Sequence, residues 1–532
     1  ARTFTWNGKY VRDSVFPGAL HAVCVLSDYA HEKILSSDTS EAEELAGSER
    51  IYTGDQIKHL IKSMPQPIVQ PALPAHYPTF WPLAVDKVTF HGEPVALVVA
   101  RDKYVAEDAA ELVFVDYEEL EPVLDPEEAL KPESAIIHEK DGTNEIFSMT
   151  FTGGDTEASQ AENAAEVEKI FQNAPIVVKD RFKTHRTGVT PMEPRAILCD
   201  WDDSDGLLAY ITTQRPHIDR LALSDILDIS AEKVQVIAPR DQGGGFGVKA
   251  PFYRENIIIA HAARDLKQPV RWVESRYESL MNVGQERDQI NDMEIAADLE
   301  GNMLALRNFG LADNGVGTTG VYWGFVMPFL GAIELPNGYK WPKADIRLKV
   351  ATTNKACLTP SRAFGHFPTR FAIERCIDMV AHKIGMEPST FRRRNLVADL
   401  PYTSITNEYF DSGDFLKVWD TLMEKANLTD FRVQQKNALS EGKYIGIGFG
   451  CGVELSGVAS ELFVPMENQP GYGAATVRLD PRGKVQVFGG DAPGGQGHET
   501  TTAQVVASEF GSSPEAVSYT PLTLPTINPC YN

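Results

Sequence analysis

The stretch IAPRDQGGGFGVK, residues 237–249, leads from an apolar strand directly into a glycine-rich loop. The strand is indicated by Val234, Val236 and Ile237, and the loop contains Gly243, Gly244, Gly245 and Gly247. Glycine adopts positive φ without steric cost and lets a ligand lie on the main chain, where consecutive N–H groups form an anion-binding concavity. The pattern therefore indicates either a site for a phosphate or an oxygen-rich cofactor, or a tight turn at a domain boundary.

Two common nucleotide-binding motifs do not fit this loop. A mononucleotide P-loop requires G-x-x-x-x-G-K-[ST], whereas Lys249 is followed by Ala250 instead of a hydroxyl residue. A Rossmann G-x-G-x-x-G fingerprint fails on spacing, so direct hydride transfer to NAD on this chain is disfavoured.

Length and composition indicate a multidomain globular protein. A chain of 532 residues with 43% apolar and 23% charged residues is long enough for two or three domains, each with its own core. The formal charge of −24 makes nucleic acid and anionic membranes poor partners, while a small neutral or cationic substrate would not be repelled. No apolar run approaches membrane-spanning length, and the first residues carry no secretory signal.

The six cysteines are scattered without C-x-x-C spacing. This spacing argues against an iron-sulfur or zinc cluster on this chain and against a disulfide framework. We therefore expect a cytoplasmic protein with free thiols.

Two polar residues earlier in the chain are candidates for chemistry. A strand over Leu207–Thr213 delivers Gln214, whose carboxamide can donate to an oxo or hydroxo ligand without changing charge, or can simply be a turn residue before Pro216. In the segment PMEPR, Glu193 either contacts substrate or cofactor or forms a structural ion pair with Arg195, and the ion pair is the favoured interpretation.

Two further segments carry residues suited to binding. In SRAFG, Arg362 offers a planar cation for developing negative charge and Phe364 a ring for a planar substrate, although such an arginine can also bridge carboxylates between domains. In GGQGHETTTAQ, the turn Gly495–Gln496–Gly497 precedes a helix, which makes a second potential anion site.

Together, eight segments in order give the sequence a family resemblance. They are GEPVALVVARDKYVAEDAAELVFVDYEEL from Gly92, PMEPR from Pro191, TTQRPH from Thr212, QGGGFGVK from Gln242, SRAFG from Ser361, ERCIDMVAHKIGMEPSTFRRRNL from Glu374, DSGD from Asp411 and GGQGHETTTAQ from Gly494. The chain resembles the molybdenum-binding large subunits of the xanthine dehydrogenase/aldehyde oxidase family, most closely the branch with the carbon monoxide dehydrogenase large subunits.

The resemblance implies a mixed α/β (α+β) fold. Its expected parts are a hammerhead-like α/β domain over 1–140, a first molybdopterin-binding domain over 141–425 and the start of a second, incomplete one over 426–517. Residues 518–532, rich in Thr, Pro and Leu, depart from the family and are expected to be an aberrant tail on a C-terminally truncated chain.

The resemblance also implies roles for individual residues. Gln214 would lie beside the oxo ligand of molybdenum, and Arg362 and Phe364 would face the substrate. The pterin dithiolene, and no side chain, would hold the metal. The residues implied to bind molybdopterin cytosine dinucleotide are Gln214, Gly243, Gly244, Gly245, Phe246 (through its N–H, or else as a core anchor), Gly247, Arg362, Gly495, Gln496 and Gly497.

The sequence departs from the family pattern at several positions. Ala250 stands where xanthine- and aldehyde-type members have a glutamate, and Ala363 stands where carbon monoxide dehydrogenases have a copper-binding cysteine. The glutamate that acts as base belongs to a C-terminal region that the family has beyond this sequence, and neither Glu193 nor Glu255 corresponds to it. We therefore expect this chain alone to be inactive.

The expected function is that of a molybdenum hydroxylase subunit. It would insert water-derived oxygen into an electron-poor C–H of an aromatic heterocycle, aldehyde or related carbonyl substrate. Electrons would pass to an iron-sulfur small subunit and an FAD-binding medium subunit, in a dimer of heterotrimers. The alternative is a chain that binds or delivers cofactor without turnover.

Overall fold

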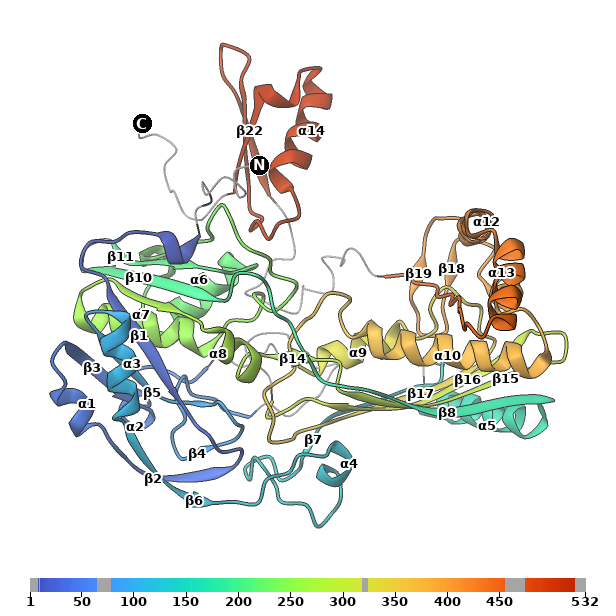
Figure 1. Cartoon of the computed structure of the whole chain (residues 1–532), viewed down its shortest axis with the longest axis horizontal. Helices are drawn as coiled ribbons and strands as arrows, with labels where there is room; N and C mark the ends of the chain where they lie inside the picture. Colours follow the sequence, from blue (N-terminus) through green and yellow to red (C-terminus); the bar gives the residue numbers. More distant parts are fainter. Residues whose placement is uncertain are drawn as a thin grey trace.

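Two large sheets and a smaller C-terminal unit make up the chain (Figure 1). The computed structural model describes residues 8, 10–64, 78–154, 156–317, 324–454 and 474–521. Within this part, no helix is both long and apolar enough to span a membrane. The α-helices are α1 Ser40–Glu44, α2 Gly54–Ile57, α3 Lys103–Glu111, α4 Pro126–Ala129, α5 Glu157–Asn173, α6 Pro216–Ile226, α7 Arg254–Leu266, α8 Arg276–Met281, α9 Val326–Ile333, α10 His366–Ile384, α11 Pro388–Asn395, α12 Phe415–Ala426, α13 Leu428–Ser440 and α14 His498–Phe510.

A seven-stranded sheet joins the N-terminal region to the segment that carries the glycine loop. Its order is β12 (Val234–Ile237), β11 (Gly206–Ile211), β10 (Ala196–Asp202), β13 (Val270–Val273), β1 (Leu20–Leu26), β5 (Pro94–Ala100) and β3 (Ser48–Thr53). Parallel pairing of Leu20 with Val270 makes the junction. Because every residue of β5 is buried, the sheet has a continuous apolar centre, against which helix α7 packs.

A small antiparallel sheet lies beside the N-terminal strands. Its order is β4 (Lys87–Val88), β2 (Glu32–Asp38) and β6 (Phe114–Glu119). Helix α3 begins after Asp102, because the Asp102 carboxylate accepts the backbone N–H groups of Tyr104 and Val105. Composition predicts a proline-rich connector over 65–82, and most of that segment lies outside the described residues.

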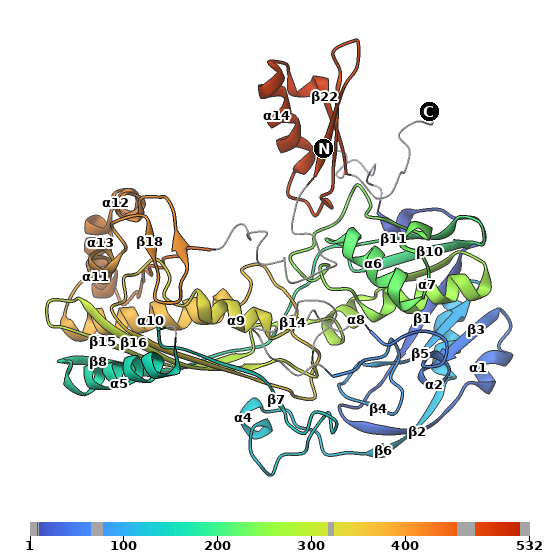
Figure 2. The same ribbon diagram turned by 180° about the vertical axis from the view of Figure 1, so that it is seen from behind.

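A five-stranded sheet forms the second large layer. Its order is β7 (Glu145–Phe151), β17 (Ala344–Ala351), β16 (Met303–Asp313), β15 (Gln289–Ala297) and β8 (Ile176–Thr184). Helix α10 lies along one face and α5 along the other in both views (Figures 1 and 2). Successive side chains of β15 point to opposite faces of the sheet, so both faces are apolar and each is covered by a helix. Met293 and Ile295 pack with α10 residues, while Ala296 packs with Val167 of α5.

Two helices begin earlier than their apolar periodicity indicates. Apolar periodicity predicts one helix over Leu221–Ile229 and another over Glu374–Gly385. In the structure these helices start at Pro216 and His366. Proline is tolerated in the first turn of a helix, where its missing N–H has no intrahelical partner, so Pro216 and Pro368 do not interrupt these helices.

The C-terminal unit is a three-stranded sheet packed on α14. Strands β20 (Ala475–Leu479) and β21 (Val485–Gly489) are antiparallel, and β22 (Val517–Pro521) pairs parallel with β21. Ser518–Pro521, the first residues of the expected aberrant tail 518–532, complete this sheet as part of β22. The remaining tail, 522–532, lies outside the described residues.

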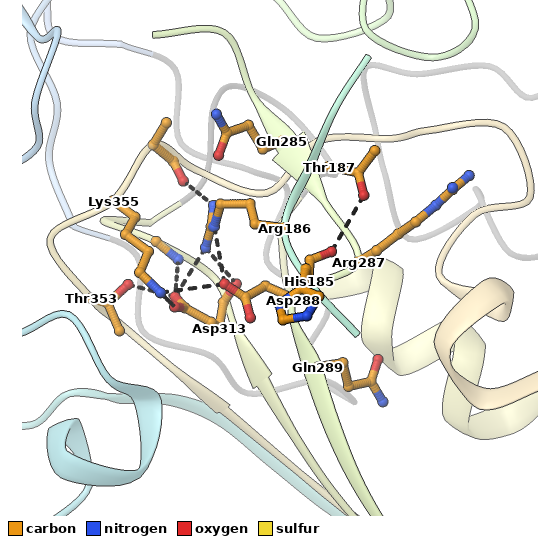
Figure 3. A network of polar contacts seen from close by, with 12 residues as sticks. His185, Arg186, Thr187, Gln285, Arg287, Asp288, Gln289, Asp313, Thr353 and Lys355 are labelled. Atoms are coloured by element: carbon orange, nitrogen blue, oxygen red, sulfur yellow. Dashed lines mark hydrogen bonds and ion pairs between the residues drawn. The ribbon is translucent and has the colours of Figure 1, made fainter. Parts of the chain in front are cut away.

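A partly buried, charge-balanced network lies at one end of the five-stranded sheet, next to the ends of β8, β15, β16 and β17 (Figure 3). Arg186 contacts Asp288 at 3.2 Å and Asp313 at 3.1 Å, and Lys355 Nζ lies 2.6 Å from Asp313. Although burial opposes it, Arg186 and Lys355 hold the pKa of Asp313 below its ordinary value. Arg186 also donates to the carbonyl of Ala356 at 2.5 Å, so the network fixes the segment that leads to Ser361.

Candidate cofactor and substrate site

The glycine loop presents three consecutive N–H groups that have no hydrogen-bond acceptor among the described residues. Gly244, Phe246 and Gly247 have φ values of 97°, 54° and 100°, so the backbone alternates in handedness as in an anion-binding nest. The N–H groups of Gly243 and Gly247 bind side chains. Among the described residues, those of Gly244, Gly245 and Phe246 have no hydrogen-bond acceptor, which leaves a cradle for an oxygen-rich ligand.

Three distant segments approach this loop so closely that only glycine fits. A Cβ on Gly243 would collide with Glu193, and one on Gly247 with the carbonyl of Pro360. A Cβ on Gly245 would lie 2.6 Å from Oε1 of Gln214. The glycines are therefore required by the neighbouring protein segments.

Gln214 is bonded to the loop at two points. Its backbone N–H donates to the carbonyl of Lys249 at 2.9 Å, and its Oε1 accepts the N–H of Gly247 at 3.0 Å. The residue is therefore part of the loop's support and more than a turn residue after β11.

Glu193 pairs with Lys249, and the favoured interpretation of a Glu193–Arg195 pair is wrong. Its Oε2 lies 2.9 Å from Nζ of Lys249 and accepts the N–H of Gly243 at 2.8 Å. Both side chains are buried, and burial lowers the pKa of Lys249. Lys249 was not among the predicted site residues, although its position at the end of the glycine loop was a signal for it.

Arg195 points instead into a buried cluster below the loop. It contacts Glu255 at 2.9 Å and Glu274 at 2.6 Å, and its guanidinium lies 3.9 Å from the ring centre of Tyr253. Burial alone would lower the pKa of Arg195, but the two carboxylates offset this and raise it. Glu255 is thus engaged in a structural ion pair and is not placed to act as a base.

The turn Ser361–Gly365 is joined to the glycine loop through the backbone. The N–H of Arg362 donates to the carbonyl of Phe246 at 3.0 Å. The side chains of Arg362 and Phe364 are exposed, and Arg362 makes no ion pair with a described residue. The alternative that Arg362 bridges carboxylates between domains is therefore not what the described residues show.

The ring of Phe246 is 49% exposed. Its left-handed backbone turns the ring over Gly244 and out of the core. Core anchoring, one of the two predicted roles of Phe246, is therefore wrong, while its N–H remains available.

The second predicted glycine turn, Gly495–Gln496–Gly497, precedes α14. Helix α14 contacts the segment that leads into the glycine loop. Glu499, in the first turn of α14, forms an ion pair with Arg240, three residues before Gly243. A Cβ on Gly495 or Gly497 would meet nothing within 4 Å, so this turn is open.

The described residues suit a cofactor bound through the backbone. They contain no group of three His, Cys, Asp or Glu side chains arranged to hold a metal ion. The five described cysteines are free thiols: Cys24, Cys199, Cys357, Cys376 and Cys451. The cradle Gly244–Phe246, together with Gln214, offers donors to ligand oxygens instead.

Protein-family models match most of the sequence. Residues 5–121 match the a/b hammerhead domain of aldehyde oxidase and xanthine dehydrogenase. Residues 137–396 and 421–523 each match a molybdopterin cofactor-binding domain. The second of these matches extends past Val517, in agreement with strand β22.

Two curated relatives align over nearly the whole chain. The nicotine 6-hydroxylase large subunit of Paenarthrobacter nicotinovorans is 33% identical over 97% of the chain and 62% of its own length. The carbon monoxide dehydrogenase large chain of Afipia carboxidovorans is 32% identical over 95% of the chain and 63% of its own length. The chain thus spans less than two thirds of these relatives.

Solved structures show the same fold. Quinoline 2-oxidoreductase from Pseudomonas putida 86 superimposes with a TM-score of 0.90 at 31% identity, covering 98% of the chain and 65% of that structure. A Cu,Mo-CO dehydrogenase superimposes with a TM-score of 0.87 at 31% identity, covering 98% of the chain and 66% of that structure.

Proposed function

Because the chain belongs to the family of molybdenum-binding large subunits of xanthine dehydrogenase and aldehyde oxidase, we propose that it serves a hydroxylation at an electron-poor C–H bond. Water supplies the oxygen, the carbon loses two electrons and two protons are released. The electrons leave through iron-sulfur and FAD groups on partner subunits. The molybdopterin cofactor, in its cytosine dinucleotide form, supplies the redox chemistry when bound.

The observation that carries this proposal is the cradle of three free N–H groups beside Gln214. Gly244, Gly245 and Phe246 offer donors to ligand oxygens without adding charge. Gln214 already uses Oε1 to bind Gly247, which points its carboxamide at the same loop. The open turn Gly495–Gln496–Gly497 would bind the distal, dinucleotide part of the cofactor.

The substrate side of the site is the turn Ser361–Gly365. Arg362 would stabilise negative charge as it develops, and Phe364 would stack on a planar substrate. Nicotine and quinoline, which appear in the names of two relatives, are nitrogen heterocycles. This supports an aromatic heterocycle as the substrate, ahead of an aldehyde or related carbonyl compound. Ala363 has no copper-binding side chain, so the Cu,Mo chemistry of the carbon monoxide enzyme is not proposed here.

The partners are an iron-sulfur small subunit and an FAD-binding medium subunit, in a cytoplasmic dimer of heterotrimers. The names of the relatives as large subunits or large chains support a heteromeric enzyme. Nucleic acid and anionic membranes are not proposed as partners, because the net charge of −24 would repel them.

A second candidate function is cofactor binding without turnover by this chain. It is favoured by the carboxylates near the loop, since Glu193 is paired with Lys249 and Glu255 with Arg195. General-base help is typically worth about two to four orders of magnitude in rate. The chain alone is then expected to hold cofactor and to show no steady-state hydroxylation.

Metal and nucleotide analysis tests the proposal. The chain is co-expressed with its partner subunits and purified, molybdenum is measured by mass spectrometry, and the nucleotide released by acid is identified by chromatography. Molybdenum and CMP equimolar with the chain are expected, and their absence from a folded complex contradicts the proposal. Turnover of heterocycles by the complex supports the first function, and loaded but inactive protein supports the second.

A further inference from the structure

The turn that carries Arg362 and Phe364 has an unfavourable backbone. Ala363, Phe364 and Gly365 follow one another with φ values of 83°, 38° and 67°. Non-glycine residues rarely adopt positive φ, and they keep it only where surrounding contacts impose it. The contacts that hold these residues therefore determine where the two candidate side chains point.

Glu286 holds this turn from inside the protein. It lies on β14 (Gln285–Glu286), is 2% exposed, and its Oε1 accepts the N–H of Gly365 at 2.9 Å. On the other side, a Cβ on Gly365 would collide with the carbonyl of Met327 in α9. Gly365 is therefore fixed between a carboxylate and a helix.

Arg287 holds the same turn from the outer side. Its Nη2 donates to the carbonyl of Arg362 at 3.2 Å and to Oγ of Ser361 at 3.4 Å. Its Nε lies 3.4 Å from Oε2 of Glu286, and its guanidinium lies 4.3 Å from the ring centre of Phe367. Arg287 itself has a positive φ of 75°, so both sides of this contact are strained.

We propose that Glu286 and Arg287 form a clamp that positions the Ser361–Gly365 turn, and with it Arg362 and Phe364, for the substrate. Neither residue touches the glycine loop, so their role is positioning. Burial raises the pKa of Glu286 to about 7, against the opposing effects of the Gly365 N–H and Arg287. A carboxylate kept in so unfavourable a place is typical of a functional region, where local rules of stability are broken.

The positioning of the turn is measured first without any catalysis. Hydrogen–deuterium exchange of residues 361–367 is followed by mass spectrometry in the 532-residue chain. Glu286→Ala removes the acceptor of the Gly365 N–H, and loss of one buried hydrogen bond predicts about tenfold faster exchange in this segment. Glu286→Gln keeps an acceptor oxygen and is expected to restore most of the protection.

Glu294 provides the matched control. It is also a buried glutamate in ion pairs, with Lys179 and Arg307, but it lies on β15 in the five-stranded sheet. Glu294→Ala is expected to leave exchange at 361–367 unchanged. Equal acceleration by Glu294→Ala and Glu286→Ala, or no acceleration by Glu286→Ala, overturns the clamp. If Glu286→Ala does not fold, Arg287→Gln tests the clamp from its exposed side, with the same expected acceleration.

The consequence for substrate rests on the proposed function and is measured separately. In the assembled enzyme, Glu286→Ala is expected to lower kcat more than it raises KM, because a misplaced Arg362 loses interactions that belong to the transition state. If Glu286→Ala speeds exchange but leaves kcat unchanged, the clamp is supported but its role in positioning Arg362 for catalysis is overturned. Unchanged exchange overturns the clamp whatever the activity.

Discussion

The carboxylate of Glu193 binds both ends of the glycine loop, since one oxygen contacts the ammonium of Lys249 at 2.9 Å and the N–H of Gly243 at 2.8 Å. The loop between them has several positive φ values and three N–H groups without an acceptor among the described residues. Such a backbone needs support from outside the loop, and Glu193 supplies it from another segment of the chain. Glu193 therefore helps to hold the cradle in shape.

Lys249→Met should destabilise the protein and loosen the loop. The substitution leaves Glu193 buried without its cation, and breaking a buried ion pair in this way typically costs about 3–5 kcal/mol. Thermal unfolding measures the loss of stability, and molybdenum content measures the loosening of the loop. The double variant Glu193→Gln/Lys249→Met removes both charges and should recover much of the loss. If the single variant is as stable as the wild type, the pair does not support the loop.

Gly245→Ala should reduce cofactor content while the protein stays folded. The new methyl group would lie 2.6 Å from Oε1 of Gln214, so either the loop or the carboxamide must move. Gly448→Ala is the control, because nothing lies within 4 Å of a Cβ at that position. Equal molybdenum content in the two variants, measured per folded chain, would show that the Gln214 contact does not shape the cradle.

Arg362→Met should lower kcat more than it raises KM in the assembled enzyme. An interaction with charge that develops only in the transition state contributes to kcat and little to substrate binding. Steady-state kinetics with a heterocyclic substrate gives both constants. Full kcat at unchanged molybdenum content would mean that Arg362 is not part of the active-site wall.

Phe364→Ala should act mainly on KM. Aromatic stacking contributes roughly 0.5–1.5 kcal/mol beyond the burial of area, so KM should rise several-fold with kcat nearly unchanged. Phe364→Tyr keeps the ring and serves as the control. A change confined to kcat, or the same defect in both variants, would argue against stacking.

Glu286→Gln should remove a pH dependence of stability. The pKa of Glu286 is about 7 in the folded protein against an ordinary value of 4.5, so between these values the folded state binds a proton that the unfolded state does not. The free energy of unfolding should therefore fall by up to about 3 kcal/mol as pH rises through this window. This loss of stability is complete at pH values above the pKa of Glu286 in the folded protein.

The measurement is the difference in the free energy of unfolding between the wild type and Glu286→Gln at a series of pH values. Asp219 and Glu408 are also buried carboxyls with raised pKa values, of about 7 and about 8. They titrate in both proteins, so their effects cancel in the difference. A difference that does not change between pH 4.5 and 7 contradicts the prediction.

Local patterns were sufficient to predict much of the fold. The residue pattern predicts strands over 176–184 and 289–297 and a helix over 157–172. The structure has both strands at these positions and the helix over Glu157–Asn173. Their alternation and capping residues act within a few positions of the chain, so the sequence records them directly. The glycine loop was recognisable from its local composition, whereas Gln214 and the SRAFG turn were recognisable mainly through the family resemblance. The structure brings all three together.

Segment ends and long-range pairing were less predictable. The extension of the last sheet to Pro521 depends on β22 lying beside β21, some thirty residues earlier, and composition pointed the other way. Likewise, the junction of β1 with β13 unites segments 250 residues apart. Backbone pairing across such separations leaves little trace in either strand alone.

Sequence alone was sufficient to identify the family, to place many but not all of the strands and helices, and to name the residue types offered to a cofactor. It did not place β16 and α9, which lie in the glycine-rich, aromatic span before Tyr339. Only the tertiary structure decided which charges meet. Arg195 is two residues from Glu193 but pairs with Glu255 and Glu274, while Glu193 pairs with Lys249, 56 residues away. The support of the Arg362 turn by Glu286 was likewise not recognisable. Residues 192 and 193 form a bend ahead of β10, so Glu193 and Arg195 are not held on one face as residues two apart in a strand would be. A buried charge then takes whichever partner the packing brings within reach.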